Sequence, residues 1–377
     1  MRILNLSTLR INDSHNYYGG AIGNIAYNLM ASLATLDSVQ LTTFTQGTDL
    51  TGDLPQSMDL IHVDSYDEVK KRVHDLDITD DTVLTHLYFH EPEYAPLASV
   101  AGDHQQPFVI GMCEPPHPRL KDEVSGIERL PLVRTVGKKL LYMPRFKRTL
   151  RQCDRLVTVN EYATSYYSEY IAEEKMSTAP YGVDTELFEA TSLPETPRIL
   201  VVSRLIKRRG IDTLVESLPA VVETHPDVVV DIVGEGPRKE QLTQSAQQLG
   251  IRDRITFHGN VGPETLVEQY QRCSVFCHLS MADGWNQPAL EAMASRRPVV
   301  TIDAPHNSVV TEGETGYKIP FGDADKLAAT LTQLFSDPQL ATTMADAGRK
   351  RAETTYSWDR IAKQYKTIFD SALQHSE

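Results

Sequence analysis

Residues 197–233 read PRILVVSRLIKRRGIDTLVESLPAVVETHPDVVVDIV, and this stretch decides the fold class. Two apolar, β-branched runs, 197–203 and 228–233, flank a helical pattern at 210–224. The runs are continuously apolar, which is typical of strands that are covered on both faces of a parallel sheet. The stretch therefore predicts a strand–helix–strand unit of a doubly wound α/β fold.

The same alternation of short apolar runs and longer helical patterns continues in both directions along the chain. The other expected strands are 2–7, 39–44, 59–63, 82–86, 107–112, 155–159, 254–257, 274–278 and 298–302. The other expected helices are 21–36, 163–172, 237–249, 263–272, 288–295, 324–335, 338–350 and 358–374. A segment rich in Pro and Thr, 190–197, predicts a linker. We expect two doubly wound Rossmann-like α/β domains facing a central cleft, with the ligand in that cleft.

Composition and charge exclude several classes of protein. The 377 residues are 41% hydrophobic and 23% charged, which is typical of a soluble globular chain of two or three domains. The net charge of −14 disfavours nucleic acid as a partner. Four scattered cysteines indicate a reducing compartment. Without a long apolar run or an apolar N-terminal segment, we expect a cytoplasmic protein.

The strongest chemical motif is MADGWNQPALEAMA at 281–294, after the expected strand 274–278. Asp283 lies in the loop, Pro288 suits the first turn of a helix, and Glu291 follows about one turn later. Carboxylates bind sugar and ribose hydroxyls, and the N–H groups of a helix N-terminus bind phosphate. The alternative is an acidic surface turn with a glutamate that interacts with the helix dipole. The spacing alone favours that alternative.

The motif resembles the E-x7-E signature of retaining glycosyltransferases of the GT-B fold, glycosyltransferase family 4 (glycosyl transferases group 1). The resemblance continues through 297–300 and 312–317. It implies that Glu291 binds the ribose and Asp283 the sugar of a nucleotide diphosphate sugar. Asp283 replaces the usual first Glu, so its carboxylate is one methylene shorter. The residues expected around the diphosphate at the helix start are Asn286, Gln287, Ala289 and Leu290.

A basic segment, 202–212, resembles the G-R-L-x-x-x-K-G segment of the same family. Arg204 and Arg209 correspond to the family Arg and Lys that hold the diphosphate. Two cations there can stabilise the charge that builds on a leaving nucleoside diphosphate. Arg209 keeps the charge of the family Lys but has a forked geometry. The alternative is a solvated basic cluster, which is what we expect of Lys207 and Arg208.

Two glycine pairs follow expected strands. Gly234 and Gly236 resemble the V-G-x-G-P turn of the family, and their small size would let the backbone approach a ligand. Gly19 and Gly20 resemble its glycine loop, which approaches the donor phosphate. In the first pair, the alternative is a turn that needs glycine for steric reasons. In the second pair, the alternative is a flexible loop after a strand.

The segment 86–92, HLYFHEP, resembles the His-Glu-Pro segment of bacterial phosphatidylinositol mannosyltransferases. This places His90 near the transferred sugar, with His117 as a second candidate for orienting an acceptor hydroxyl. The segment 181–188 and Trp358 also match family segments, so the motifs occur in the family order over nearly the whole chain. The resemblance implies domains at 1–190 and 191–355, with the helix of 356–377 packing back on the first domain.

The resemblance implies a hexosyltransferase that uses a GDP-mannose or UDP-glucose type of donor, retains the anomeric configuration and needs neither metal nor cofactor. The acceptor would be a glycan, a glycolipid or another lipid-linked hydroxyl. The alternatives are a catalytically silent binding or scaffold protein, a sugar-nucleotide epimerase or a phosphorylase. The D-x-D sequence at 323–325 imitates a metal motif, but its place at a helix start suits an N-cap.

Residues 129–151 hold eight basic side chains and no acidic one. An amphipathic pattern at 133–143 predicts a helix that ends at Pro144, followed by a basic cluster around Phe146. Basic residues beside apolar ones predict an anionic membrane surface as a partner, with peripheral attachment to the inner face of a membrane. Two alternatives are a first-domain helix with solvated charges and a site for an acceptor phosphate.

Overall fold

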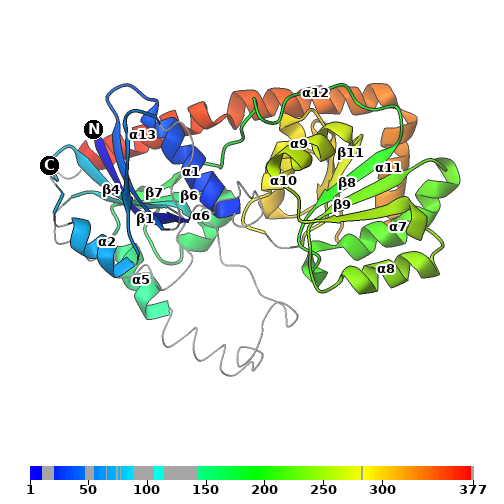
Figure 1. The fold of residues 1–377 in the computed structure, drawn as a ribbon, viewed down its shortest axis with the longest axis horizontal. Coiled ribbons are helices and arrows are strands. Elements are labelled where there is room, and N and C mark those ends of the chain that lie inside the picture. The colour runs from blue at the N-terminus through cyan, green and yellow to red at the C-terminus, as the bar shows by residue number, and fades with distance from the viewer. Residues whose placement is uncertain are drawn as a thin grey trace. The chain divides into compact units, whose positions relative to one another are not determined.

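The computed structural model describes residues 1–10, 21–46, 55–64, 66–73, 75–76, 78–87, 106–113, 143–281 and 283–374 (Figure 1). Contacts divide these residues into two units. Unit 1 holds the described residues up to Gly182 and those from Trp358 on, and unit 2 is Val183–Ser357. Each unit contains one parallel sheet, so the expected doubly wound α/β class is confirmed.

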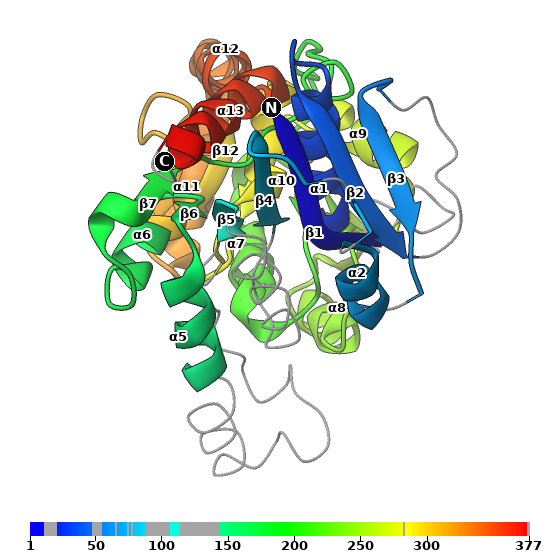
Figure 2. The ribbon, with the colours of Figure 1, turned by 90° about the vertical axis from the view of Figure 1, so that its left-hand side faces the viewer.

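Unit 1 is built on a seven-stranded parallel sheet in the order β3-β2-β1-β4-β5-β6-β7 (Figure 2). Its strands are β1 (Arg2–Arg10), β2 (Gln40–Gln46), β3 (Met58–His62), β4 (Thr82–Leu87), β5 (Phe108–Cys113), β6 (Arg155–Thr158) and β7 (Met176–Thr178). Its α-helices are α1 (Ala21–Ala34), α2 (Tyr66–Val73), α5 (Met143–Gln152), α6 (Glu161–Tyr167) and α13 (Trp358–Gln374). The centre of the sheet is apolar, with Leu4, Leu84 and Ile110 buried in one cluster.

The helix α13 completes unit 1 although it follows unit 2 in the chain. It packs against α1, β4 and β5, and it buries Tyr365 and Phe369. At the start of the helix, the Trp358 ring lies against Gly182. A Cβ added to Gly182 would lie 2.5 Å from Cδ2 of that ring, so only glycine fits beside it.

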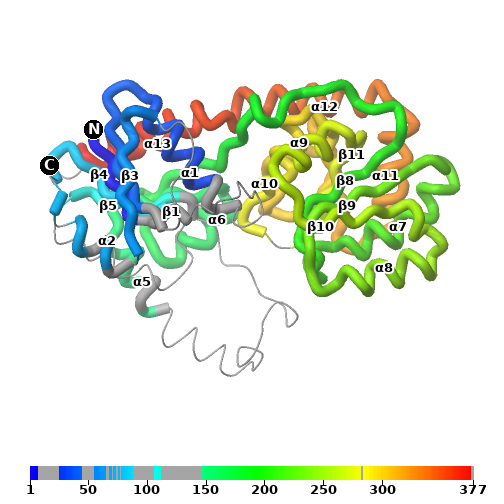
Figure 3. The backbone as a smooth tube through the Cα atoms, in the orientation of Figure 1, coloured from blue at the N-terminus to red at the C-terminus, as the bar shows by residue number. Residues whose placement is uncertain are grey.

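Unit 2 is built on a six-stranded parallel sheet in the order β10-β9-β8-β11-β12-β13. The backbone of this unit can be followed in Figure 3, where β8, β9, β10 and β11 are labelled. Its strands are β8 (Arg198–Val202), β9 (Val229–Val233), β10 (Ile255–Gly259), β11 (Val275–His278), β12 (Val299–Ile302) and β13 (Gly316–Ile319). Its α-helices are α7 (Ile211–Thr224), α8 (Lys239–Gln248), α9 (Pro263–Arg272), α10 (Gln287–Ala294), α11 (Ala324–Ser336) and α12 (Pro338–Thr355). The stretch 197–233 forms β8, α7 and β9, as its pattern predicted.

The pairing and burial of strands β8 and β9 explain why the sequence of that stretch predicted them correctly. They pair in parallel from Arg198↔Val229 to Val202↔Val233. Ile199 and Val230 belong to the apolar cluster that also includes Leu214 of α7. Burial of both strands on both faces accounts for their continuously apolar sequence.

The structure differs from the expected elements at several places. The strands β7 and β13 and the helices α2 and α5 were not predicted. The expectation that Pro144 ends a helix is wrong, because α5 begins at Met143 and carries Pro144 in its first turn. A first-turn proline removes no intrahelical hydrogen bond, since that N–H has no partner in the helix. The helix expected at 163–172 is α6, which begins earlier, after the cap Asn160.

The expected linker, 190–197, lies within unit 2. The guanidinium of the buried Arg297 donates hydrogen bonds to Oγ1 of Thr191 and, at 3.1 Å, to the carbonyl oxygen of Ser192. The division between units falls earlier, between Gly182 and Val183. Within the described part of the chain, no helix has both the length and the apolar composition that crossing a bilayer requires.

Candidate functional site

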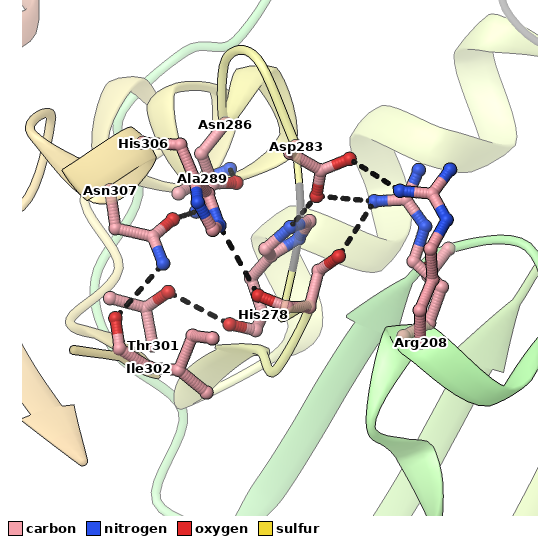
Figure 4. Close-up of polar contacts among 12 residues, drawn as sticks. Arg208, His278, Asp283, Asn286, Ala289, Thr301, Ile302, His306 and Asn307 are labelled. Carbon is pink, nitrogen blue, oxygen red and sulfur yellow. Dashed lines mark hydrogen bonds and ion pairs between the residues drawn. The ribbon is translucent and has the colours of Figure 1, made fainter. Parts of the chain in front are cut away.

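The loops of unit 2 that carry the predicted site residues follow its strands, at the carboxyl edge of the sheet. Figure 4 shows one of these residues, Asp283, beside Arg208 and His278. The loop after β8 carries Arg204 and Arg209, and the loop after β11 carries Asp283 and leads into α10, which carries Glu291. Because β8 and β11 are neighbours in a parallel sheet, their following loops meet at one edge. The fold therefore brings together two motifs that lie far apart in the sequence.

Asp283 is the centre of a buried ionic cluster and is only 6% exposed. Its Oδ2 lies 2.5 Å from Nη1 of Arg209 and accepts a 2.9 Å hydrogen bond from Nε2 of His278. Its Oδ1 lies 3.6 Å from Nη1 of Arg208. Both carboxylate oxygens thus contact cationic side chains. A sugar hydroxyl that bound Asp283 would have to share these oxygens with the arginines or displace the arginines from them.

The charge states in this cluster follow from burial and from its contacts. Burial acts to raise the pKa of Asp283, but the charge of Arg209 and the hydrogen bond from His278 outweigh it and hold that pKa below its usual range. Burial lowers the pKa of His278, so its imidazole is neutral at pH 7 and donates through Nε2. Among the described residues of the cluster, two guanidinium groups and one carboxylate sum to one positive charge, which suits an anionic ligand.

The basic residues of the loop after β8 differ in their exposure. Arg204 is exposed, as is Lys207, but Arg208 is buried. The expectation that Arg208 is solvated is therefore wrong. The turn Lys207–Arg209 directs it inward, and the N–H of Met281 donates a 2.9 Å hydrogen bond to its carbonyl oxygen.

Gly210 makes that turn possible. It has φ +67°, and a Cβ there would lie 2.3 Å from the carbonyl oxygen of Leu279. Any other residue would strain the backbone and push the two loops apart. Gly210 therefore keeps the arginine loop close to the loop of Asp283.

Asn286 caps the N-terminus of α10 and is fully buried. Its Oδ1 accepts a 3.2 Å hydrogen bond from the N–H of Ala289, and its backbone oxygen accepts one of 3.3 Å from the N–H of Leu290. Its Nδ2 donates at 2.7 Å to Oδ1 of Asn307. The N–H groups of Ala289 and Leu290, which were expected to meet the diphosphate, are therefore engaged by Asn286 in this structure.

Glu291 lies one turn into α10 and is 5% exposed. Its Oε2 accepts a 2.8 Å hydrogen bond from the Tyr270 hydroxyl, whose single proton is shared with the carbonyl oxygen of Pro288 at 3.2 Å. Burial raises the pKa of Glu291 to about 8, although the Tyr270 hydrogen bond lowers it. The pKa of Glu291 therefore depends on the hydrogen bonds that its carboxyl group receives.

The glycines after β9 are explained by their protein neighbours. Gly234 has φ +124°, and a Cβ there would lie 2.1 Å from the carbonyl oxygen of Ser203. A Cβ on Gly236 would lie 2.4 Å from the carbonyl oxygen of Leu205. Their small size lets this turn pack on the loop that carries Arg204, which supports the steric alternative.

Gly19, Gly20, His90 and His117 are outside the described residues. Asp323 caps α11, since its Oδ1 accepts a 2.8 Å hydrogen bond from the N–H of Lys326, and the predicted N-cap role is confirmed.

The sequence did not predict that His278 and Tyr270 belong to the site, nor that Arg208 is buried in it. His278 ends an apolar strand, and Tyr270 occupies an apolar position of α9, so neither carries a motif. Only the three-dimensional contacts reveal them.

Residues 183–351 match the family described as glycosyl transferases group 1. The match covers less than half of the chain, so the similarity to this family is shown for that part. The glycosyl transferase domain thus coincides with most of unit 2 and contains the cluster around Asp283 as well as Glu291 and its partner Tyr270. The expected family is confirmed.

Curated relatives of the chain include two mycobacterial enzymes. The "MMP alpha-(1->4)-mannosyltransferase" of Mycolicibacterium hassiacum is 28% identical over 68% of this chain. The "GDP-mannose-dependent alpha-(1-6)-phosphatidylinositol monomannoside mannosyltransferase" of Mycolicibacterium smegmatis is 29% identical over 62% of it. Each match spans 64% of the length of the relative.

Solved structures similar to the chain show its fold. Sucrose-phosphate synthase from Thermosynechococcus elongatus has a TM-score of 0.76 at 20% identity, covering 100% of both chains. Anabaena HepE in complex with UDP has a TM-score of 0.70 at 16% identity, covering 98% of this chain and 100% of that one. Together with the two parallel sheets, these similarities confirm the expected GT-B fold class.

Proposed function

We propose that the protein transfers a hexose from a nucleotide diphosphate sugar to a hydroxyl group of an acceptor, with retention at the anomeric carbon. One observation carries the proposal. The cluster of Arg208, Arg209 and Asp283 lies at the carboxyl edge of a sheet in a domain of glycosyl transferases group 1. Such a buried, net positive cluster suits a diphosphate leaving group.

The proposed roles follow from the chemistry of each group. Arg204, which is exposed, and Arg209 would bind the diphosphate and stabilise the charge that builds on it as the glycosidic bond breaks. Glu291 would accept hydrogen bonds from the ribose hydroxyls. A phosphate oxygen of the departing diphosphate would take the proton of the acceptor hydroxyl, so that catalysis is mainly positioning and electrostatic stabilisation.

The donor and the acceptor belong to the proposal. The names of the relatives favour mannose from GDP-mannose. UDP-glucose is the second candidate donor, and the acceptor would be a glycan, a glycolipid or another lipid-linked hydroxyl. The described part of the basic segment supports an acceptor at an anionic membrane. On α5, Lys147, Arg148 and Arg151 are exposed while Thr149 and Leu150 are buried.

A panel of donors tests the proposal. GDP-mannose, UDP-glucose and related sugar nucleotides are incubated with the protein, with and without candidate acceptors, and products are followed by mass spectrometry. We expect nucleoside diphosphate release that depends on acceptor, and a glycoside whose anomeric configuration by NMR equals that of the donor. Binding without release would indicate a scaffold protein. An isomerised sugar nucleotide formed without acceptor would indicate an epimerase.

A further inference from the structure

His278 is a polar side chain in a fully buried strand end. It is 3% exposed and is the last residue of β11, where every residue is buried. Its backbone is fixed from the next strand, because Oγ1 of Thr301 donates a 2.8 Å hydrogen bond to its carbonyl oxygen. The imidazole itself donates to Asp283 at 2.9 Å. A buried polar group costs stability unless it is hydrogen-bonded, and Asp283 supplies that hydrogen bond to the His278 side chain.

The imidazole shares one atom of Asp283 with Arg209. Oδ2 of Asp283 accepts from Nε2 of His278 and also lies 2.5 Å from Nη1 of Arg209 (Figure 4). The same Nη1 lies 3.3 Å from Oγ of Ser280. The side chain of Asp283 is short, so the hydrogen bond from His278 limits the positions that its carboxylate can take. The carboxylate in turn limits where the guanidinium of Arg209 can lie.

The pairing does not cancel the positive charge of the site. Oδ1 of Asp283 faces the second buried guanidinium, that of Arg208, at 3.6 Å. One carboxylate therefore balances one of the two cations. An arginine side chain has many rotamers, and one that is held in advance loses less freedom when it binds an anion. Asp283 thus has a use that needs no contact with a sugar hydroxyl.

We infer that His278 and Asp283 are positioning residues for Arg209: His278 orients the carboxylate of Asp283, and Asp283 holds the guanidinium where it meets the diphosphate of the donor. This inference rests on the proposed function, and it assigns Asp283 a role other than the binding of the donor sugar. Arg208 supplies the cation that keeps the held pair attractive to an anion.

The test replaces His278 without changing the charge of the site. In His278→Leu an apolar side chain of similar volume removes the donor, and in His278→Gln an amide nitrogen can take the place of Nε2. We expect kcat with the preferred donor to fall about 10- to 100-fold in His278→Leu, with the melting temperature nearly unchanged. His278→Gln should regain most of the lost rate. Equal rates in wild type and His278→Leu would overturn the inference.

A double-mutant cycle shows whether the effect passes through Arg209. In an Arg209→Ala background, His278→Leu should cause little further loss of kcat. If it causes the same loss there as in wild type, His278 acts by another route and the inference is wrong. The matched control is Ser217→Ala, which removes a buried 2.8 Å hydrogen bond within α7 and should leave kcat unchanged.

Crystal structures of the wild type and His278→Leu proteins decide the inference even if no donor is turned over. We expect the guanidinium of Arg209 to keep its contact with Asp283 in the wild type and to leave it, or adopt several rotamers, in the variant. An unmoved Arg209 in the variant would contradict the inference. Failure of the wild type to bind GDP or UDP by calorimetry would instead contradict the proposed function, and the positioning result would stand separately.

Discussion

The single O–H of Tyr270 is shared between the carboxyl group of Glu291, at 2.8 Å, and the carbonyl oxygen of Pro288, at 3.2 Å. A single side chain of α9 therefore fixes the start of α10 and the group proposed to recognise the ribose. The ring of Tyr270 is itself held edge-on by Phe188, with centroids 5.5 Å apart. This arrangement makes Tyr270 a determinant of the charge of Glu291.

Changing Tyr270 to Phe should shift the pH dependence of donor binding. The hydrogen bond from Tyr270 lowers the pKa of Glu291. Its removal should therefore raise that pKa above its wild-type value of about 8. Ribose hydroxyls donate to a carboxylate, and KM for the donor should therefore fall as pH rises through the pKa of Glu291. We expect this fall at higher pH in Tyr270→Phe. The control Tyr317→Phe, on β13, should keep the wild-type profile.

Glu291→Gln should change stability in a pH-dependent way. The pKa of Glu291 is raised from 4.5 to about 8 in the folded protein, so the folded state binds the proton more tightly than the unfolded state. The resulting stability is fully present below pH 4.5 and is lost as pH rises through 8, and a shift of this size corresponds to roughly several kcal/mol. Melting temperatures of wild type and variant should be similar near pH 5, and the variant should be the more stable at pH 9. A difference that does not vary with pH would contradict this.

Arg204→Ala and Arg209→Ala should each lower kcat by ~10²–10³, because each removes a cation from the leaving diphosphate. The measurement is the initial rate with saturating donor and acceptor. Lys207→Ala is the matched control, since Lys207 is an exposed basic residue of the same loop. Near-normal turnover in both arginine variants would refute their assignment.

Replacing Lys147, Arg148 and Arg151 by Ser should weaken binding to anionic vesicles. Each cation near such a surface is worth about 1 kcal/mol, so we expect partitioning to fall by roughly 100-fold at low salt. Co-sedimentation with vesicles containing phosphatidylserine measures it. The control replaces three exposed lysines elsewhere, Lys326, Lys350 and Lys363, with the same change in net charge. Equal loss in both variants would show only a net-charge effect.

Much of the fold was predictable because its strands are covered on both faces. A continuous apolar run such as 199–202 is too short for a helix and too apolar for a surface loop, so such runs located β8 and its neighbours. The missed elements carry weaker signals. Strand β7 has three residues with none buried, and α2 reads YDEVKKRV, in which charges outnumber apolar residues. Their formation depends on packing against the rest of unit 1.

The site was predictable where a motif fixes both residue type and spacing, as for Asp283 and Glu291. The direction of a side chain was not. Arg208 and Lys207 are adjacent basic residues, yet one is buried against Asp283 and the other is exposed. The turn at Gly210 decides between them, and its φ of +67° is a property of the folded loops. His278 likewise gains its importance only from the carboxylate beside it.

The place of α13 has a consequence for how the protein is made. The described residues of unit 2 form one segment, Val183–Ser357, but unit 1 needs a helix that the ribosome synthesises after that segment. Until Tyr365 and Phe369 emerge, β4 and β5 lack the cover that α13 provides. The described segment of unit 2 is therefore fully synthesised before unit 1 is complete, and unit 1 exposes apolar surface until α13 is synthesised. A chaperone that binds nascent chains should hold the N-terminal half longest.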